Sequence, residues 1–88
     1  MPINNVKITT SAYDTLALKD IYVALVRLQN RDFGNIDEDI KRNNTRGMLL
    51  NKEVIGIYVS KKGIKFYIKA DLTNNTIIIY LSNEQPEC

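Results

Sequence analysis

The chain has 88 residues, enough for one small domain with a thin hydrophobic core and too few for two domains. Its net charge of +2 excludes a strongly basic composition, so a nucleic-acid-binding or membrane-binding surface would need a local cluster of cations. The chain contains no histidine, which removes the commonest general base and the commonest transition-metal ligand in proteins.

The single cysteine and the chain ends point to an intracellular protein. Cys88 has no second cysteine to pair with, so neither an internal disulfide bond nor a cysteine-rich zinc site can form, which favours a reducing compartment. Residues 1–7 lack the apolar segment of a secretory signal, and the longest apolar run, 77–81, is far too short to span a membrane. We therefore expect a cytoplasmic single domain over residues 1–88, with an ordered core over about 6–82 and a tail over 83–88.

The first predicted elements are a short strand and a helix. Residues 6–10 alternate apolar and polar side chains and include β-branched residues, which predicts a strand. Ser11, followed three residues later by Asp14, marks the start of a helix that runs to about Asn30. The sequence leaves open whether residues 11–30 form one helix or a short turn followed by a longer helix. The apolar stripe with helical spacing consists of Leu18, Ile21, Tyr22, Leu25 and Leu28.

A second helix is predicted, with Asp37 as its N-terminal cap. Acidic residues occupy its first turn and the cations follow, an order that suits the helix macrodipole. Because its apolar side chains are sparse, we expect this helix to lie on the surface and to contribute little to the core. Those apolar side chains are Ile36, Ile40 and Met48.

Three runs of strand-forming residues follow, at roughly 54–60, 64–71 and 76–82. Lys62-Gly63 and Asn74-Asn75 separate them and are typical of two-residue hairpin loops. Such loops would pair Tyr58 with Tyr67 in the first hairpin and Ala70 with Ile79 in the second. The predicted apolar face then contains Ile55, Ile57, Val59, Phe66, Ile68, Ala70, Leu72, Ile77, Ile79 and Leu81. The opposite face contains Tyr58, Ser60, Lys65, Tyr67, Lys69, Asp71, Ile78, Tyr80 and Ser82.

These elements predict an α+β fold with two layers. An antiparallel sheet of three to four strands would pack its apolar face on one main helix, in the element order β-α-α-β-β-β. The last strand is so apolar that it would promote aggregation as an open sheet edge. We expect the strand at 6–10 to cover it, and a second subunit is the alternative, so monomer and homodimer both stay open.

The predicted outer face of the sheet is the first candidate site. Its tyrosines and lysines could simply stabilise a solvated sheet through cross-strand pairs. They could instead form a protein–protein or homodimer surface, since tyrosine is enriched there, or bind a single-stranded nucleic acid by stacking and charge. The candidate residues are Tyr58, Lys65, Tyr67, Lys69, Ile78 and Tyr80.

A basic patch on the two helices is the second candidate site. Phosphate binding is one interpretation, but the acidic residues at 37–39 lie one or two helical turns away and offset the cations. A solvated helix surface with salt bridges is therefore the preferred interpretation. The patch consists of Arg27, Arg31, Lys41, Arg42 and Arg46.

We find no pattern typical of a catalytic, metal or cofactor site. The acids at 37–39 and Asp32 could in principle hold Mg²⁺, but no second acidic cluster accompanies them, and acids are expected at a helix start. The four glycines form no phosphate-binding loop, and no serine or cysteine has a candidate base. Cys88, an exposed thiol in the tail, is expected to be incidental and not reactive, and the sequence leaves open whether it has a role. These observations predict a protein that is not an enzyme and binds no cofactor.

The order of helices followed by three strands resembles the ribosome-dependent RNA-cleaving toxins of the RelE type. That resemblance implies a basic surface and C-terminal Arg, Tyr or His residues that cleave RNA. In this chain the tail at 82–88 is acidic, and the last arginine is Arg46. The topology therefore agrees with the toxins, whereas the catalytic residues are missing.

The chain also resembles a family of short proteins described only as plasmid-related, which bacterial plasmids and phages carry. Phe33 and Tyr67 stand where that family usually has tryptophan, and its closing Leu-Pro is absent. The matching elements are residues 8–12, the Asp-Phe-Gly at 32–34, the acids at 37–39 with Asn44, Tyr58, Gly63, the Tyr-Ile at 67–68, and residues 77–81.

This resemblance implies a mobile genetic element as the context. Together with the small size, the lack of catalytic groups and the tyrosine-rich sheet face, it predicts a non-enzymatic binding protein. Such a protein would act by occupying a host protein, for example as an inhibitor of a defence system of the anti-CRISPR or anti-restriction type. The alternatives are a RelE-like ribonuclease toxin and a module that binds single-stranded nucleic acid. The sequence does not identify the host partner.

Overall fold

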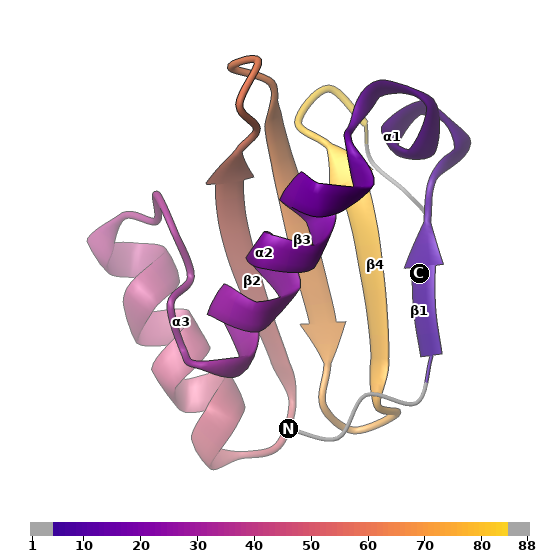
Figure 1. Cartoon of the computed structure of the whole chain (residues 1–88). Helices are drawn as coiled ribbons and strands as arrows, with labels where there is room; N and C mark the ends of the chain where they lie inside the picture. The colour runs from indigo at the N-terminus through magenta and orange to yellow at the C-terminus, as the bar shows by residue number, and fades with distance from the viewer. Residues whose placement is uncertain (1–4, 85–88) are drawn as a thin grey trace.

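The chain folds into a four-stranded sheet with one helix across a face and another along an edge (Figure 1). The computed structural model describes residues 5–84. The elements in chain order are β1 Asn5–Ile8, α1 Thr10–Thr15, α2 Leu18–Gln29, α3 Glu38–Leu49, β2 Glu53–Val59, β3 Lys65–Asp71 and β4 Thr76–Leu81. The α+β class and the packing of a sheet on one main helix are thus confirmed.

The sheet is mixed, which corrects the prediction of an antiparallel sheet. Its strand order is β1-β4-β3-β2, and β1 runs parallel to β4 while the other pairs are antiparallel. Three helices separate β1 from the hairpins, so no tight turn sets its direction. β1 covers the edge of β4, as expected for so apolar a final strand.

The first helical region consists of two helices. The side chain of Thr9, two residues before the predicted start, accepts a hydrogen bond from the backbone N–H of Ala12 and caps α1. Extended backbone at Leu16 and Ala17 then interrupts the helix. Ile21, Ala24 and Leu28 of α2 are buried against the sheet. Leu18 and Tyr22, which the predicted stripe assigned to the core, are each 68% exposed.

The register of β2 against β3 differs by one residue from the prediction, so Tyr58 pairs with Phe66. The connection has three residues between Ser60 and Ile64, whose backbone N–H and carbonyl form a 2.9 Å hydrogen bond. Gly63 takes the left-handed conformation, with φ of 81°, as this longer loop requires. A shift of one residue exchanges the two faces of a strand. β2 therefore turns Tyr58 toward the core and Ile57 toward the outer face.

The register of β3 against β4 differs by two residues, so Ala70 pairs with Ile77. The side chain of Asp71 accepts hydrogen bonds from the backbone N–H groups of Thr73 and Asn74, which holds a longer turn than Asn74-Asn75 alone. A shift of two residues keeps every side chain on its face. The predicted faces of these two strands are therefore confirmed, although the pairs are wrong.

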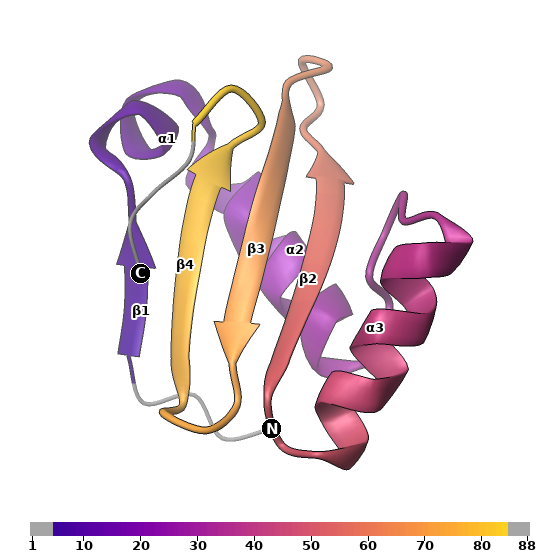
Figure 2. The ribbon, with the colours of Figure 1, turned by 180° about the vertical axis from the view of Figure 1, so that it is seen from behind.

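α3 lies beside β2 at the edge of the sheet (Figure 2). As predicted, Asp37 caps it, and the side chain accepts a hydrogen bond from Ile40 at 2.8 Å. Its buried residues are Asn44 and Gly47, and only Met48 packs at the margin of the core. The expectation of a surface helix that contributes little to the core is confirmed.

Two sets of hydrogen bonds occupy the open edge of β2 beside α3. The side-chain amide of Asn44 donates to the carbonyl of Ile55 at 2.8 Å and accepts from its N–H at 2.9 Å, as a neighbouring strand would. Farther along, Ile57 bonds through its N–H to the carbonyl of Phe33 and through its carbonyl to the N–H of Asn35. The edge of the sheet at these residues is thus blocked against pairing with another chain.

Candidate functional site

The outer face of the sheet retains five of the six residues predicted for it. Figure 2 shows this face uncovered by α2, which lies behind the sheet. The rings of Tyr67 and Tyr80 are half-buried, with centroids 5.4 Å apart. The ammonium of Lys69 lies 3.5 Å from the carboxylate of Glu53. Lys65 is exposed and Ile78 is half-buried. The face is therefore largely occupied by its own cross-strand contacts.

Tyr58 does not belong to that face, which corrects the prediction. Its side chain is 2% exposed, and its hydroxyl donates to the backbone carbonyl of Asp32 at 2.9 Å. The ring packs at 5.9 Å from that of Phe66, and the guanidinium carbon of Arg27 lies 5.1 Å from the Tyr58 ring centroid. Tyr58 thus joins β2 to the end of α2 from inside the core.

Gly56, two residues before Tyr58 on the same strand, leaves room for this ring. A Cβ at residue 56 would lie 2.4 Å from the hydroxyl oxygen of Tyr58, closer than any tolerated contact. Glycine on the core face, two residues before a large aromatic residue, was the sequence signal for the true orientation of β2.

Burial raises the pKa of Tyr58 well above its ordinary value. The native state therefore holds the phenol proton more tightly than the unfolded chain, whose tyrosines ionise near pH 10. The contribution of Tyr58 to stability should be complete below about pH 10 and should fall as the pH rises further. Urea unfolding of the native chain and of Tyr58→Phe between pH 9 and 11.5 should show the stability difference between them narrowing. Parallel curves would contradict this prediction.

The predicted basic patch divides into paired and unpaired cations. The guanidinium of Arg27 lies 2.8 Å from the carboxylate of Asp32 at the end of α2. That hydrogen-bonded pair lowers the pKa of Asp32. On α3, Arg42 pairs with Asp39, and Arg46 is exposed. The remaining two cations of the patch, Arg31 and Lys41, line opposite walls of one cleft.

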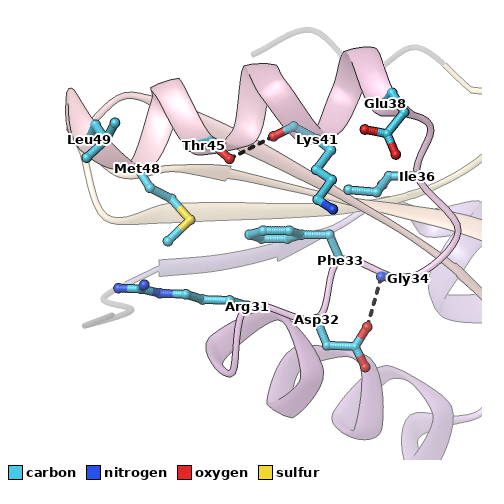
Figure 3. Close-up of a pocket in the computed structure, with 10 residues that line it drawn as sticks. All are labelled: Arg31, Asp32, Phe33, Gly34, Ile36, Glu38, Lys41, Thr45, Met48 and Leu49. Carbon is cyan, nitrogen blue, oxygen red and sulfur yellow. Dashed lines mark hydrogen bonds between the residues drawn. The ribbon is translucent and has the colours of Figure 1, made fainter.

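This cleft lies between the segment 31–36 and α3, with a volume of about 630 Å³ (Figure 3). The ring of Phe33 stands between the two walls, and Lys41 points toward it from α3. Arg31 extends along the opposite wall, and the thioether of Met48 points inward. The lining residues are Arg31, Asp32, Phe33, Gly34, Ile36, Glu38, Lys41, Thr45, Met48 and Leu49. The sequence predicted its cations and not its apolar floor.

The outward face of α2 is an apolar surface that the sequence analysis missed. α2 crosses one face of the sheet, and no other described element lies over it (Figure 1). Leu18 and Tyr22 are 68% exposed, Val23 48% and Val26 38%. We call these four residues the α2 face. The sequence contained a sign of this surface, because α2 carries apolar side chains on its outward side as well as on the side that faces the sheet.

No metal-ligand cluster of three or more acidic, cysteine or histidine side chains occurs within residues 5–84. Cys88 lies outside the described residues. Among the described helices, none combines the length and the apolar character that crossing a bilayer requires.

Comparisons with protein-family models, with curated proteins and with solved structures gave no match, so the resemblance to plasmid-related proteins stays a prediction.

Proposed function

We propose that the chain is a non-enzymatic binding protein that contacts a partner protein through the α2 face. One observation carries the proposal: a helix that covers a sheet on one side exposes four large apolar side chains on the other. A surface helix normally carries polar residues there, and contiguous exposed apolar patches mark interaction sites. A partner with an apolar surface of its own is the chemistry that fits.

Shape and chemistry support this surface over the outer face of the sheet. On the sheet, Tyr67 and Tyr80 pack on each other, and Lys69 is paired with Glu53. On the α2 face, Tyr22 and Leu18 are more than two-thirds exposed, so contact with a partner would remove new apolar area from water. A host protein is the partner class that the resemblance to plasmid-related proteins implies.

The α2 face can be tested by replacing Tyr22 and Val26 together with glutamine. Both side chains are exposed, so the variant should keep its fold and its unfolding free energy within about 0.5 kcal/mol per site. We expect affinity for the captured partner to fall by at least about 30-fold, the effect of losing about 2 kcal/mol at a binding hot spot. The measurement is capture from nuclease-treated host lysate, followed by titration of the purified partner.

A matched variant, Tyr67→Ser, separates the two surfaces. Loss of the partner in Tyr67→Ser with full binding by the α2 variant would contradict the proposal and favour the sheet face. Recovery of RNA alone in a parallel capture from untreated lysate, with affinity that falls steeply as salt rises, would favour the nucleic-acid alternative. Sedimentation of the purified chain beside the α2 variant shows whether a second copy occupies the α2 face, because such a dimer should be lost in the variant.

A further inference from the structure

We propose that the cleft between residues 31–36 and α3 is a binding site for a small amphipathic carboxylate, with an apolar body and one negative charge. The proposal does not depend on the α2 face, because no residue of that face lines the cleft. It rests on three features of the cleft: two unpaired cations, an apolar floor, and a strained arginine at its wall.

The charge of the cleft follows from how the ion pairs are arranged. Within the described part of the chain, Arg31 and Lys41 have no ion-pair partner, whereas Arg27 and Arg42 are each paired with an aspartate. The carboxylate of Asp32 turns away from the cleft toward Arg27 and the N–H of Gly34 (Figure 3).

Glu38 is the remaining acid of the lining, and it offsets one of the two cations. Because Arg27, outside the lining, neutralises Asp32, the remaining charges of Arg31, Lys41 and Glu38 leave the cleft with one net positive charge. That charge favours a ligand with a single carboxylate.

The floor of the cleft is apolar and partly accessible. Phe33, Ile36 and Met48 are half-buried and line the cleft, and Phe33 and Met48 also pack against the core. A volume of about 630 Å³ is in the range of small-molecule sites, which combine such surface with a few convergent polar groups. An alkyl or aryl body would cover Phe33 and Met48, and its carboxylate would lie at Lys41, which points toward Phe33, while Arg31 adds positive charge on the opposite wall (Figure 3).

Arg31 occupies a backbone position that glycine would fill with less strain. The N–H of Asp32 bonds to the carbonyl of Arg27 at 2.8 Å, and that of Arg31 bonds to Leu28 at 3.0 Å, which is the usual glycine-terminated helix end. Arg31 has a φ of 62°, in the left-handed region that a residue with a Cβ adopts at a cost. Its side chain reaches along the wall of the cleft (Figure 3). The strained position thus holds a cation on the wall of the cleft.

The test is a titration of the isotopically labelled full chain, followed by backbone amide signals in NMR spectra. Decanoate is the probe, with acetate as the control for the carboxylate alone and decyltrimethylammonium as the control for the same apolar body with the opposite charge. We expect saturable shifts centred on Phe33, Gly34, Lys41 and Thr45 with decanoate. Its affinity should exceed that of either control at least tenfold and should weaken as NaCl is raised, because the charges are accessible to salt.

Two pairs of variants make the result specific. Lys41→Gln should lower the affinity for decanoate at least fivefold. Arg42→Gln, one residue farther along α3 and outside the lining, should leave that affinity unchanged. Arg31→Gly should lower the affinity for decanoate as strongly. The same variant should raise the unfolding midpoint, because glycine adopts the left-handed backbone conformation without strain. Asn51→Gly, at the corresponding position after α3 with a φ of 54°, should leave binding unchanged.

Equal affinity for decanoate and decyltrimethylammonium would overturn the proposal, as would equal effects of Lys41→Gln and Arg42→Gln. Shifts confined to the α2 face would also overturn it and would assign the apolar interaction to that surface. Failure of the α2 face to bind a partner would leave these results unaffected.

Discussion

Replacing Tyr58 with alanine is expected to lower the free energy of unfolding by about 3–5 kcal/mol, the usual cost of removing a buried aromatic side chain. The ring is buried between α2 and the sheet against Phe66, and its hydroxyl bonds to the carbonyl of Asp32. Small domains have little stability to lose, so a loss of this size would leave much of the protein unfolded. Circular dichroism and urea unfolding at neutral pH provide the measurement.

Tyr58→Phe separates the ring from its hydroxyl. This variant keeps the packing and removes only the bond to Asp32, so the expected loss is about 1–2 kcal/mol. Tyr22→Ala is the matched control, because its ring is 68% exposed and its removal should change stability by no more than about 0.5 kcal/mol. Similar losses in Tyr58→Ala and Tyr22→Ala would show that Tyr58 is not in the core.

The second large effect is expected at Asn44, whose side-chain amide serves as a neighbouring strand for Ile55. Asn44→Ala removes both hydrogen bonds and leaves the N–H and carbonyl of Ile55 without them, which should cost about 2–4 kcal/mol. α3 should also detach from β2 more readily. Urea unfolding measures the loss, and faster hydrogen exchange at the Ile55 amide localises it.

Asn43→Ala provides the control for this change, because it removes the same chemical group from the neighbouring, exposed position of α3. Its effect should stay within about 0.5 kcal/mol. Equal effects of the two variants, or unchanged exchange at Ile55, would refute the role assigned to Asn44. A third variant, Asn44→Asp, keeps an acceptor for the Ile55 N–H but buries a carboxylate against the Ile55 carbonyl, so it should destabilise at least as much as Asn44→Ala.

Features governed by nearby residues were predictable. Asp37 caps α3 as expected. Its side chain accepts a hydrogen bond from a backbone N–H only three residues away, so the cap depends on local sequence alone. α2 ends at Gln29 with Asn30 as its cap, close to the predicted end. The strands were found because β-branched and aromatic residues gather in short runs, and β3 and β4 alternate cleanly.

The errors arose where a single residue in a turn decides the outcome. The loop before Ile64 has one residue more than predicted, which exchanges the two faces of β2. Tyr58 therefore lies in the core and not on the candidate binding face. The alternation in β2 could not resolve this, because Ile55, Ile57 and Val59 on one face compete with Val54 and Tyr58 on the other. Burial of Tyr58 became favourable only once Asp32, far along the chain, offered a carbonyl for its hydroxyl.

The candidate sites were also predictable only in part. The sequence identified Arg31 and Lys41 as cations on two helical segments, but the approach of α3 to the segment 31–36 brought them to one cleft with Phe33. The sequence could not reveal that Arg27 and Arg42 would be paired with aspartates, because an ion pair depends on the placement of both side chains.

By itself, the sequence determined one small α+β domain, its helix starts and stops, and the inward faces of β3 and β4, because these depend on propensity, capping and periodicity over a few residues. The tertiary structure alone decided the parallel pairing of β1, the face that β2 presents, the closure of its edge by Asn44, and the exposure of the α2 face. Each of these depends on contacts between segments distant along the chain, whose energies become comparable with local preferences only after the layers have packed.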